Sequence, residues 1–111
     1  MRVLIIRPLL SPFEKEIDGT LSSMQSVVGG RIQVIYPFED DTVALICNDE
    51  GKIEGLPLNR ALTDDHGRIY DIIAGTFFIC SAPPDSESFA DLSEEQIRLY
   101  TERFARPEIY I

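Results

Sequence analysis

Residues 70–82, Y-D-I-I-A-G-T-F-F-I-C-S-A, form the most apolar and β-prone stretch of this 111-residue chain. Phe77, Phe78 and Ile79 are consecutive, so their side chains cannot all point to one face of a strand. A short apolar run of this kind is typical of a strand buried on both faces. Gly75 interrupts the run and predicts a bulge or a kink. We therefore expect residues 70–82 to form the central strand around which the other elements pack.

Further strands and two helices are predicted around this stretch. Residues 2–7, 31–37 and 43–48 are apolar or alternate between apolar and polar side chains, and residues 14–17 suit a short returning strand. A first helix is expected at about 19–29, where Asp18 or Thr20 can cap the start and Gly29-Gly30 the end. A second helix is expected at 93–105. There Ser93 and Gln96 have the spacing of a capping box.

These elements predict the fold class α+β, with a mainly antiparallel sheet and both helices packed on one face of it. A chain of this length makes one domain, so we expect residues 1–111 to fold as a single unit. The apolar tail, residues 108–111, is unusual for a terminus. We expect it to dock on the sheet or to act as a self-association element with a second copy.

The net charge of −9 is unevenly distributed. Residues 1–38 carry a net charge of +1, whereas residues 39–111 carry −10. Such a surface repels phosphate backbones, so direct nucleic-acid binding is not expected. It either serves solubility or engages a partner, which could be a host protein that binds DNA. No apolar run approaches the roughly 20 residues of a membrane span, and no export signal is recognisable, so no membrane contact is expected.

The two cysteines, Cys47 and Cys80, lie in predicted strands without the spacing of a metal site. Together with the absence of an export signal, this indicates reduced, buried thiols in a cytoplasmic protein, with a disulfide as the alternative. The single histidine, His66, lies in a predicted turn without a neighbouring nucleophile motif. The acidic pairs near residues 40, 50 and 65 lack the spacing of a calcium loop. We therefore assign no catalytic residue, metal ligand or cofactor.

Asn59 and Arg60 are the candidate binding residues. Pro57 suits the first position of a helical turn, and Leu58 and Leu62 are four residues apart, so both could face the core. Asn59 and Arg60 would then project from a rigid platform, where a guanidinium can bind a carboxylate or phosphate through two hydrogen bonds. The alternatives are a solvated pair, a salt bridge to a nearby acid, or a structural clamp for a neighbouring loop.

Several segments together resemble a known family. They are M-R-V-L-I-I-R-P (1–8), E-I-D-G-T-L (16–21), V-G-G (28–30), C-N-D-E-G-K (47–52), G-L-P-L-N-R (55–60) and D-I-I-A-G-T-F-F-I (71–79). In this order and spacing they are similar to domain of unknown function 3846. The resemblance implies a small α+β domain from bacteria, phage or mobile elements, with no established activity. It also implies a shared surface over residues 47–60, which adds Asn48 to the candidate binding residues.

Three functional hypotheses follow. The first is a non-catalytic protein-interaction module of bacterial, phage or mobile-element origin. The second is a small-ligand (anion) binding or regulatory domain that uses Asn59 and Arg60. The third is an enzyme, which ranks last because the sequence offers no nucleophile, base or metal cluster.

Overall fold

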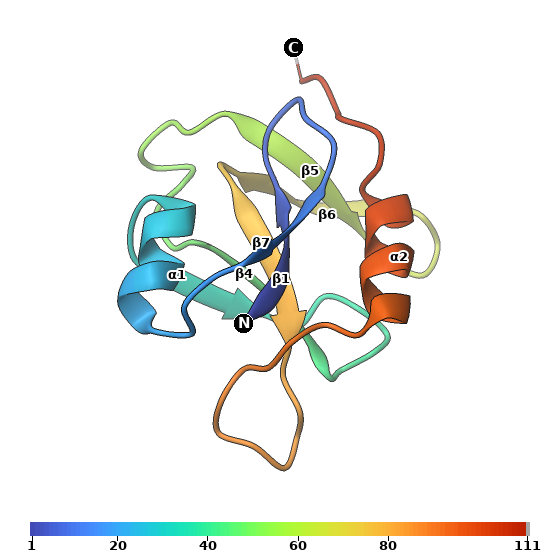
Figure 1. Cartoon of the computed structure of the whole chain (residues 1–111). Helices are drawn as coiled ribbons and strands as arrows, with labels where there is room; N and C mark the ends of the chain where they lie inside the picture. The colour runs from blue at the N-terminus through green and yellow to red at the C-terminus, as the bar shows by residue number, and fades with distance from the viewer. Residues whose placement is uncertain (111) are drawn as a thin grey trace.

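A computed structural model describes residues 1–110. Within these residues the chain forms two sheets and two helices, so the predicted α+β class is confirmed. The elements, in chain order, are β1 (Arg2–Ile6), β2 (Phe13–Glu16), α1 (Leu21–Val28), β3 (Ile32–Ile35), β4 (Val43–Asn48), β5 (Leu58–Thr63), β6 (Ile69–Ala74), β7 (Phe77–Ser81) and α2 (Glu94–Arg103). Figure 1 shows their arrangement.

The larger sheet has five strands in the order β2-β1-β7-β4-β3, and each pair of adjacent strands in it is antiparallel. The strand at its centre is β7, which pairs with β1 on one side and β4 on the other. Phe77, Phe78 and Ile79 are fully buried. The prediction that this apolar run is buried on both faces at the centre of the sheet is therefore confirmed.

The predicted strand 70–82 is in fact two strands in different sheets. β6 pairs with β5 in a separate two-stranded sheet, and only β7 enters the larger one. Gly75 lies at the crossing with a φ of 82°, and its N–H donates to the carbonyl of Pro57 at 2.7 Å. A Cβ at this position would lie 2.7 Å from Cδ1 of Leu56. The interruption predicted at Gly75 is thus a crossing from one sheet to the other.

Gly75→Val is expected to lower the free energy of unfolding by roughly 2–3 kcal/mol, because a β-branched residue is strained at positive φ and its Cβ would collide with Leu56. Urea denaturation measures this loss. Gly67→Val is the matched control, since Gly67 has a similar φ of 76° but a Cβ added there would meet nothing within 4 Å. Equal losses in both variants would show that the contact with Leu56 contributes nothing.

The two helices lie on opposite faces of the five-stranded sheet, so the prediction that both pack on one face is wrong. On one face, Tyr100 and Phe104 near the end of α2 join a buried cluster with Leu4. On the other, Met24 and Val28 of α1 pack with a second cluster that includes Ile5. Adjacent residues of β1 point to opposite faces and are both apolar, so each face needs its own cover. Figure 1 shows the helices on either side of the strands.

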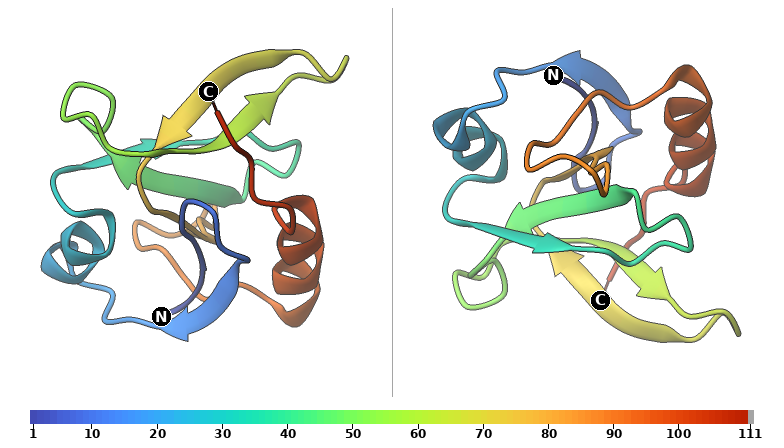
Figure 2. Two further views of the ribbon diagram at one scale, coloured as in Figure 1. Left: turned by 90° about the horizontal axis from the view of Figure 1, so that it is seen from above. Right: turned by 90° about the horizontal axis from the view of Figure 1, so that it is seen from below.

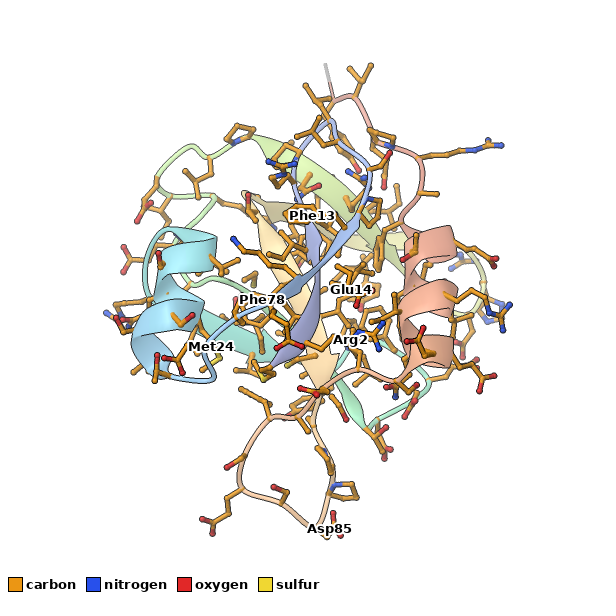
Figure 3. All side chains as sticks on the ribbon, in the orientation of Figure 1. Arg2, Phe13, Glu14, Met24, Phe78 and Asp85 are labelled. Atoms are coloured by element: carbon orange, nitrogen blue, oxygen red, sulfur yellow. The ribbon has the colours of Figure 1, made fainter. Side chains whose placement is uncertain are left out.

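The hairpin of β5 and β6 covers part of the same face as α2. Leu62 of β5 and Ile73 of β6 belong to the buried cluster that contains Tyr100 and Phe104. In Figure 2 the hairpin stands apart from the larger sheet, and its tip projects away from the body of the molecule. Figure 3 shows Met24 and Phe78 together on the α1 side, and Asp85 at the far end of the loop that follows β7.

The predicted helix ends are confirmed. The hydroxyl of Thr20 accepts a hydrogen bond from the N–H of Ser23 at 3.2 Å, and Gly29 ends α1 in the left-handed conformation. Ser93 and Gln96 form the capping box, with each side chain accepting from the backbone N–H of the other. Neither helix in residues 1–110 is long and apolar enough to cross a membrane.

Candidate functional site

The three candidate binding residues are the buried polar residues of the described part of the chain. Asn59 and Arg60 expose none of their surface and Asn48 exposes 6%. All three belong to strands, because residues 58–63 form β5 and Asn48 ends β4. The predicted helical turn at Pro57 is therefore wrong. In a strand, Leu58 and Asn59 point to opposite sides, and Leu58 is exposed while Leu62 is buried.

The guanidinium of Arg60 binds backbone carbonyls rather than carboxylates. Its Nε and Nη2 donate to the carbonyl of Phe104 at 3.2 and 3.0 Å, and Nη2 also donates to the carbonyl of Leu10 at 2.7 Å. Nη1 donates to Oδ1 of Asn59 at 2.9 Å. Phe104 is the C-cap of α2, where a positive charge is favoured by the helix dipole. Burial lowers the pKa of Arg60, and the nearby Glu108 acts in the opposite direction.

Asn59 and Asn48 each join two segments that are distant in the sequence. The amide nitrogen of Asn59 donates to the carbonyls of Ile6 and Gly75, both at 2.9 Å. The amide nitrogen of Asn48 donates to the carbonyl of Val28 at 3.2 Å, and its oxygen accepts from the N–H of Glu50 at 2.8 Å. Asn48 thus ties the end of α1 to the turn after β4.

The polar atoms of these three side chains therefore form hydrogen bonds to other groups of the same chain. In residues 1–110 no buried side-chain nitrogen or oxygen is left without a hydrogen-bond partner. An anion at Arg60 would have to replace the carbonyls of Phe104 and Leu10, and so would have to detach the end of α2. Anion binding by Asn59 and Arg60 stays a prediction. The hydrogen bonds of Arg60 correspond to the alternative of a structural clamp, because they join β5 to the β1–β2 loop and to the end of α2.

Asn48 also lines a small cleft between the turn after β4 and strand β6. The cleft has a volume of about 260 Å³, and Cys47 and Ile72 contribute to its wall. Lys52 and Asp71 form an ion pair across it. Burial is the main cause that raises the pKa of Cys47 to about 11, so its thiol is protonated near neutral pH. A protonated thiol is neither a nucleophile nor a metal ligand.

The second cysteine and the single histidine lie in different parts of the fold, since Cys80 is in β7 and His66 is in the turn between β5 and β6. Burial raises the pKa of Cys80 to about 12, and both cysteines are free thiols. His66 is exposed at the tip of the hairpin, where its backbone N–H donates to the carboxylate of Asp64. In the described part of the chain, no three His, Cys, Asp or Glu residues gather as they would around a metal ion.

A wide hollow lies between α2, the hairpin tip and the loop after β3, and has a volume of about 880 Å³. Three apolar side chains, each more than half exposed, line it: Tyr36 after β3, Tyr70 of β6 and Leu99 of α2. Both views in Figure 2 place these three elements on the same side of the molecule. We call this hollow the acidic groove, for the charges described next.

Four carboxylates line the acidic groove: Glu39 and Asp40 on one side, Asp64 and Asp65 on the other. Hydrogen bonds from Thr42 lower the pKa of Asp40, so this carboxylate stays ionised at neutral pH. The groove also contains one basic side chain. That is Arg103, whose guanidinium lies over the ring of Phe38 at 5.0 Å. The groove therefore combines exposed aromatic rings with an excess of negative charge.

Sequence reasoning missed this groove because its residues come from three separate elements. The sequence shows the acidic turn at 39–41 and the acidic pair at 64–65, but it gives no sign that these two solvated turns lie near each other. One signal was available: Ile69 and Tyr70 are consecutive large apolar residues beside a turn, and both are exposed. Their exposure could not be predicted without knowing that β6 leaves the main sheet.

Residues 1–105 match the family described as Domain of unknown function (DUF3846). The chain belongs to this family. No curated protein and no solved structure matches the chain.

The matched DUF3846 region contains every residue of the acidic groove, together with Asn48, Asn59 and Arg60. The carbonyl acceptors of Arg60 also lie within it, at Leu10 and Phe104. Glu108 and Tyr110 lie beyond it. The clamp and the groove are thus features of the DUF3846 region of this chain, whereas the contacts of the tail are additional to it.

Proposed function

We propose that this protein is a non-catalytic protein-interaction module whose acidic groove binds a basic segment of a host protein. The observation that carries the proposal is the placement of Tyr36, Tyr70 and Leu99, all more than half exposed, in one hollow ringed by four carboxylates. Exposed apolar side chains that gather in a hollow mark interaction sites. The charge around them selects the sign of the partner.

The chemistry of the groove fits lysine or arginine side chains next to an apolar anchor. An aromatic face attracts a cation, and tyrosine is among the residues that dominate binding energy at interfaces. The carboxylates at Glu39 and Asp65 would speed the approach of a positive segment and oppose a negative one. A net charge of −9 likewise disfavours nucleic acid as the partner.

The biological setting that we propose is the one implied by the resemblance to the DUF3846 family. The module would be of bacterial, phage or mobile-element origin and would meet its partner in the cytoplasm. Two free, buried thiols support a reducing compartment, because exported small domains commonly use their cysteines in disulfides. The partner would present a basic, aromatic-rich or leucine-rich segment that is exposed and extended.

Selection of peptides tests this function. A library of randomised peptides is panned on the wild-type protein alone, and the enriched peptides are then measured against Glu39→Lys/Asp65→Lys, which reverses two charges of the groove. We expect enriched peptides to contain lysine or arginine next to an aromatic residue or leucine. The double variant is expected to bind these peptides at least about tenfold more weakly, and wild-type affinity is expected to fall with added salt.

The matched control is Asp85→Lys/Glu87→Lys, which reverses the same charges in the exposed loop after β7. It should bind the selected peptides as the wild type does. The proposed function is contradicted if no peptide is enriched, if enriched peptides are acidic, or if both double variants lose binding equally.

A further inference from the structure

A second exposed surface lies at the end of the molecule that carries the β1–β2 loop and the C-terminal tail. Leu9 is 61% exposed and Ile109 is 79% exposed, and Leu58 at the start of β5 is also exposed. Pro8 and Pro57 lie beside them. We call these five residues the apolar patch. Figure 1 shows the loop and the tail side by side at this end, away from the loop that follows β7.

The fold holds Leu9 in a conformation that leucine rarely adopts. Its φ of 65° makes it the one non-glycine residue at positive φ in residues 1–110. The next residue, Leu10, is fixed from both sides: its carbonyl accepts from Arg60 at 2.7 Å, and its N–H donates to the carbonyl of Arg7 at 3.3 Å. Such strain persists where the surrounding structure imposes it, and it is concentrated at functional surfaces. Here its result is an outward-pointing leucine.

One acid, Glu108, lines the hollow beside the apolar patch and is partly buried. The carboxylate of Glu108 accepts hydrogen bonds from the N–H of Ala61 at 3.2 and 3.3 Å and from the hydroxyl of Tyr110 at 2.6 Å. This carboxylate therefore satisfies a free N–H of strand β5 instead of facing solvent alone. Glu108 is the one charged residue among those that line the hollow of this patch, on a protein of net charge −9.

Charge and shape together indicate what covers this patch. Two copies of an acidic chain repel one another wherever their carboxylates would meet, so a charge-poor face is where they can associate. A two-fold contact also requires a surface that is complementary to itself, and a projection beside a hollow is one way to provide this. The apolar patch has both, because Leu9 and Ile109 project beside a hollow of about 270 Å³ lined by the same segments.

We propose that the protein forms a symmetric homodimer through the apolar patch, with Leu9 of each copy against the hollow of the other. This contact leaves the acidic groove of each copy free, because the groove and the patch share no residue. A dimer would therefore present two grooves, and a partner with two basic segments would bind it more tightly than one groove allows.

Sedimentation equilibrium over a range of concentrations tests the dimer. The wild type is expected to approach twice its chain mass of 12.5 kDa. Leu9→Asn is expected to weaken dimerisation at least tenfold and to melt at or above the wild-type temperature, because asparagine tolerates positive φ. Ile109→Asn, which changes a side chain outside the strands and helices, should weaken it in the same way.

The control is Leu21→Asn, which changes a leucine of α1 with a similar exposure of 55% outside the patch. It should dimerise as the wild type does. Added salt should strengthen the dimer or leave it unchanged, the opposite of its expected effect on peptide binding in the groove. A wild type that stays monomeric, or a dimer unaffected by Leu9→Asn and Ile109→Asn, overturns the proposal. Loss of the dimer in Glu39→Lys/Asp65→Lys also overturns it, since association would then be head to tail.

Discussion

Arg60→Ala is expected to lower the free energy of unfolding by about 3–5 kcal/mol, because several buried acceptors lose their donor at once. The carbonyls of Phe104 and Leu10 and the amide oxygen of Asn59 all depend on this guanidinium. The substitution also empties the volume of a fully buried side chain. Chemical denaturation followed by circular dichroism measures the loss.

Two variants separate the causes of this loss. Arg60→Met restores most of the apolar volume but none of the hydrogen bonds, so it should retain more than half of the destabilisation. Arg98→Ala removes an exposed arginine of α2 and should change stability by less than about 0.5 kcal/mol. Should Arg60→Ala unfold at the wild-type denaturant midpoint, the clamp between β5, the β1–β2 loop and α2 would contribute nothing to stability.

Phe78→Ala is expected to lower the free energy of unfolding by about 3–5 kcal/mol, the usual loss when a buried phenylalanine is truncated. Phe78 lies in the central strand, directly between Ile5 of β1 and Ile46 of β4. It exposes no surface and packs on the α1 side of the sheet (Figure 3). Strands hold it on two sides, so its surroundings cannot readily collapse into the cavity.

Phe89→Ala provides the comparison for Phe78→Ala. Phe89 packs against the same buried cluster but is only partly buried and lies outside the strands. Its truncation should cost less than half as much, because the neighbouring loop can move to fill the space. Thermal melting of both variants beside the wild type decides the matter. Similar losses at the two positions would contradict a central role for β7.

Much of the local structure could be predicted from the sequence because its signals are contained within a few residues. Thr20 with Gly29 and Ser93 with Gln96 fix the helix ends through contacts three or four residues apart or through a single backbone conformation. Strand β4 has the bounds that its apolar run predicts. The apolar side chains on both faces of β1 and β4 also contained the signal that both faces need a covering helix.

The role of the candidate binding residues could not be predicted because their partners are distant in the sequence. Arg60 meets carbonyls 44 and 50 residues away, and Asn59 meets one that is 53 residues away. The sequence marks the polar pair at 59–60 as unusual in an apolar context, and both side chains are buried. Whether such a pair faces solvent or the interior depends on β5 being a strand and on the end of α2 reaching it, and neither fact is local.

The position of β7 between β1 and β4 sets the order in which the chain can fold. β1 ends at Ile6, whereas the strand that joins it to β4 begins at Phe77. During synthesis from the N-terminus, β1 and β4 therefore each keep one unpaired apolar edge until β7 has been synthesised. Long-range pairing of this kind slows folding to milliseconds or longer in domains of similar topology. Nascent chains that stop before β7 are therefore expected to aggregate more readily than the complete sheet.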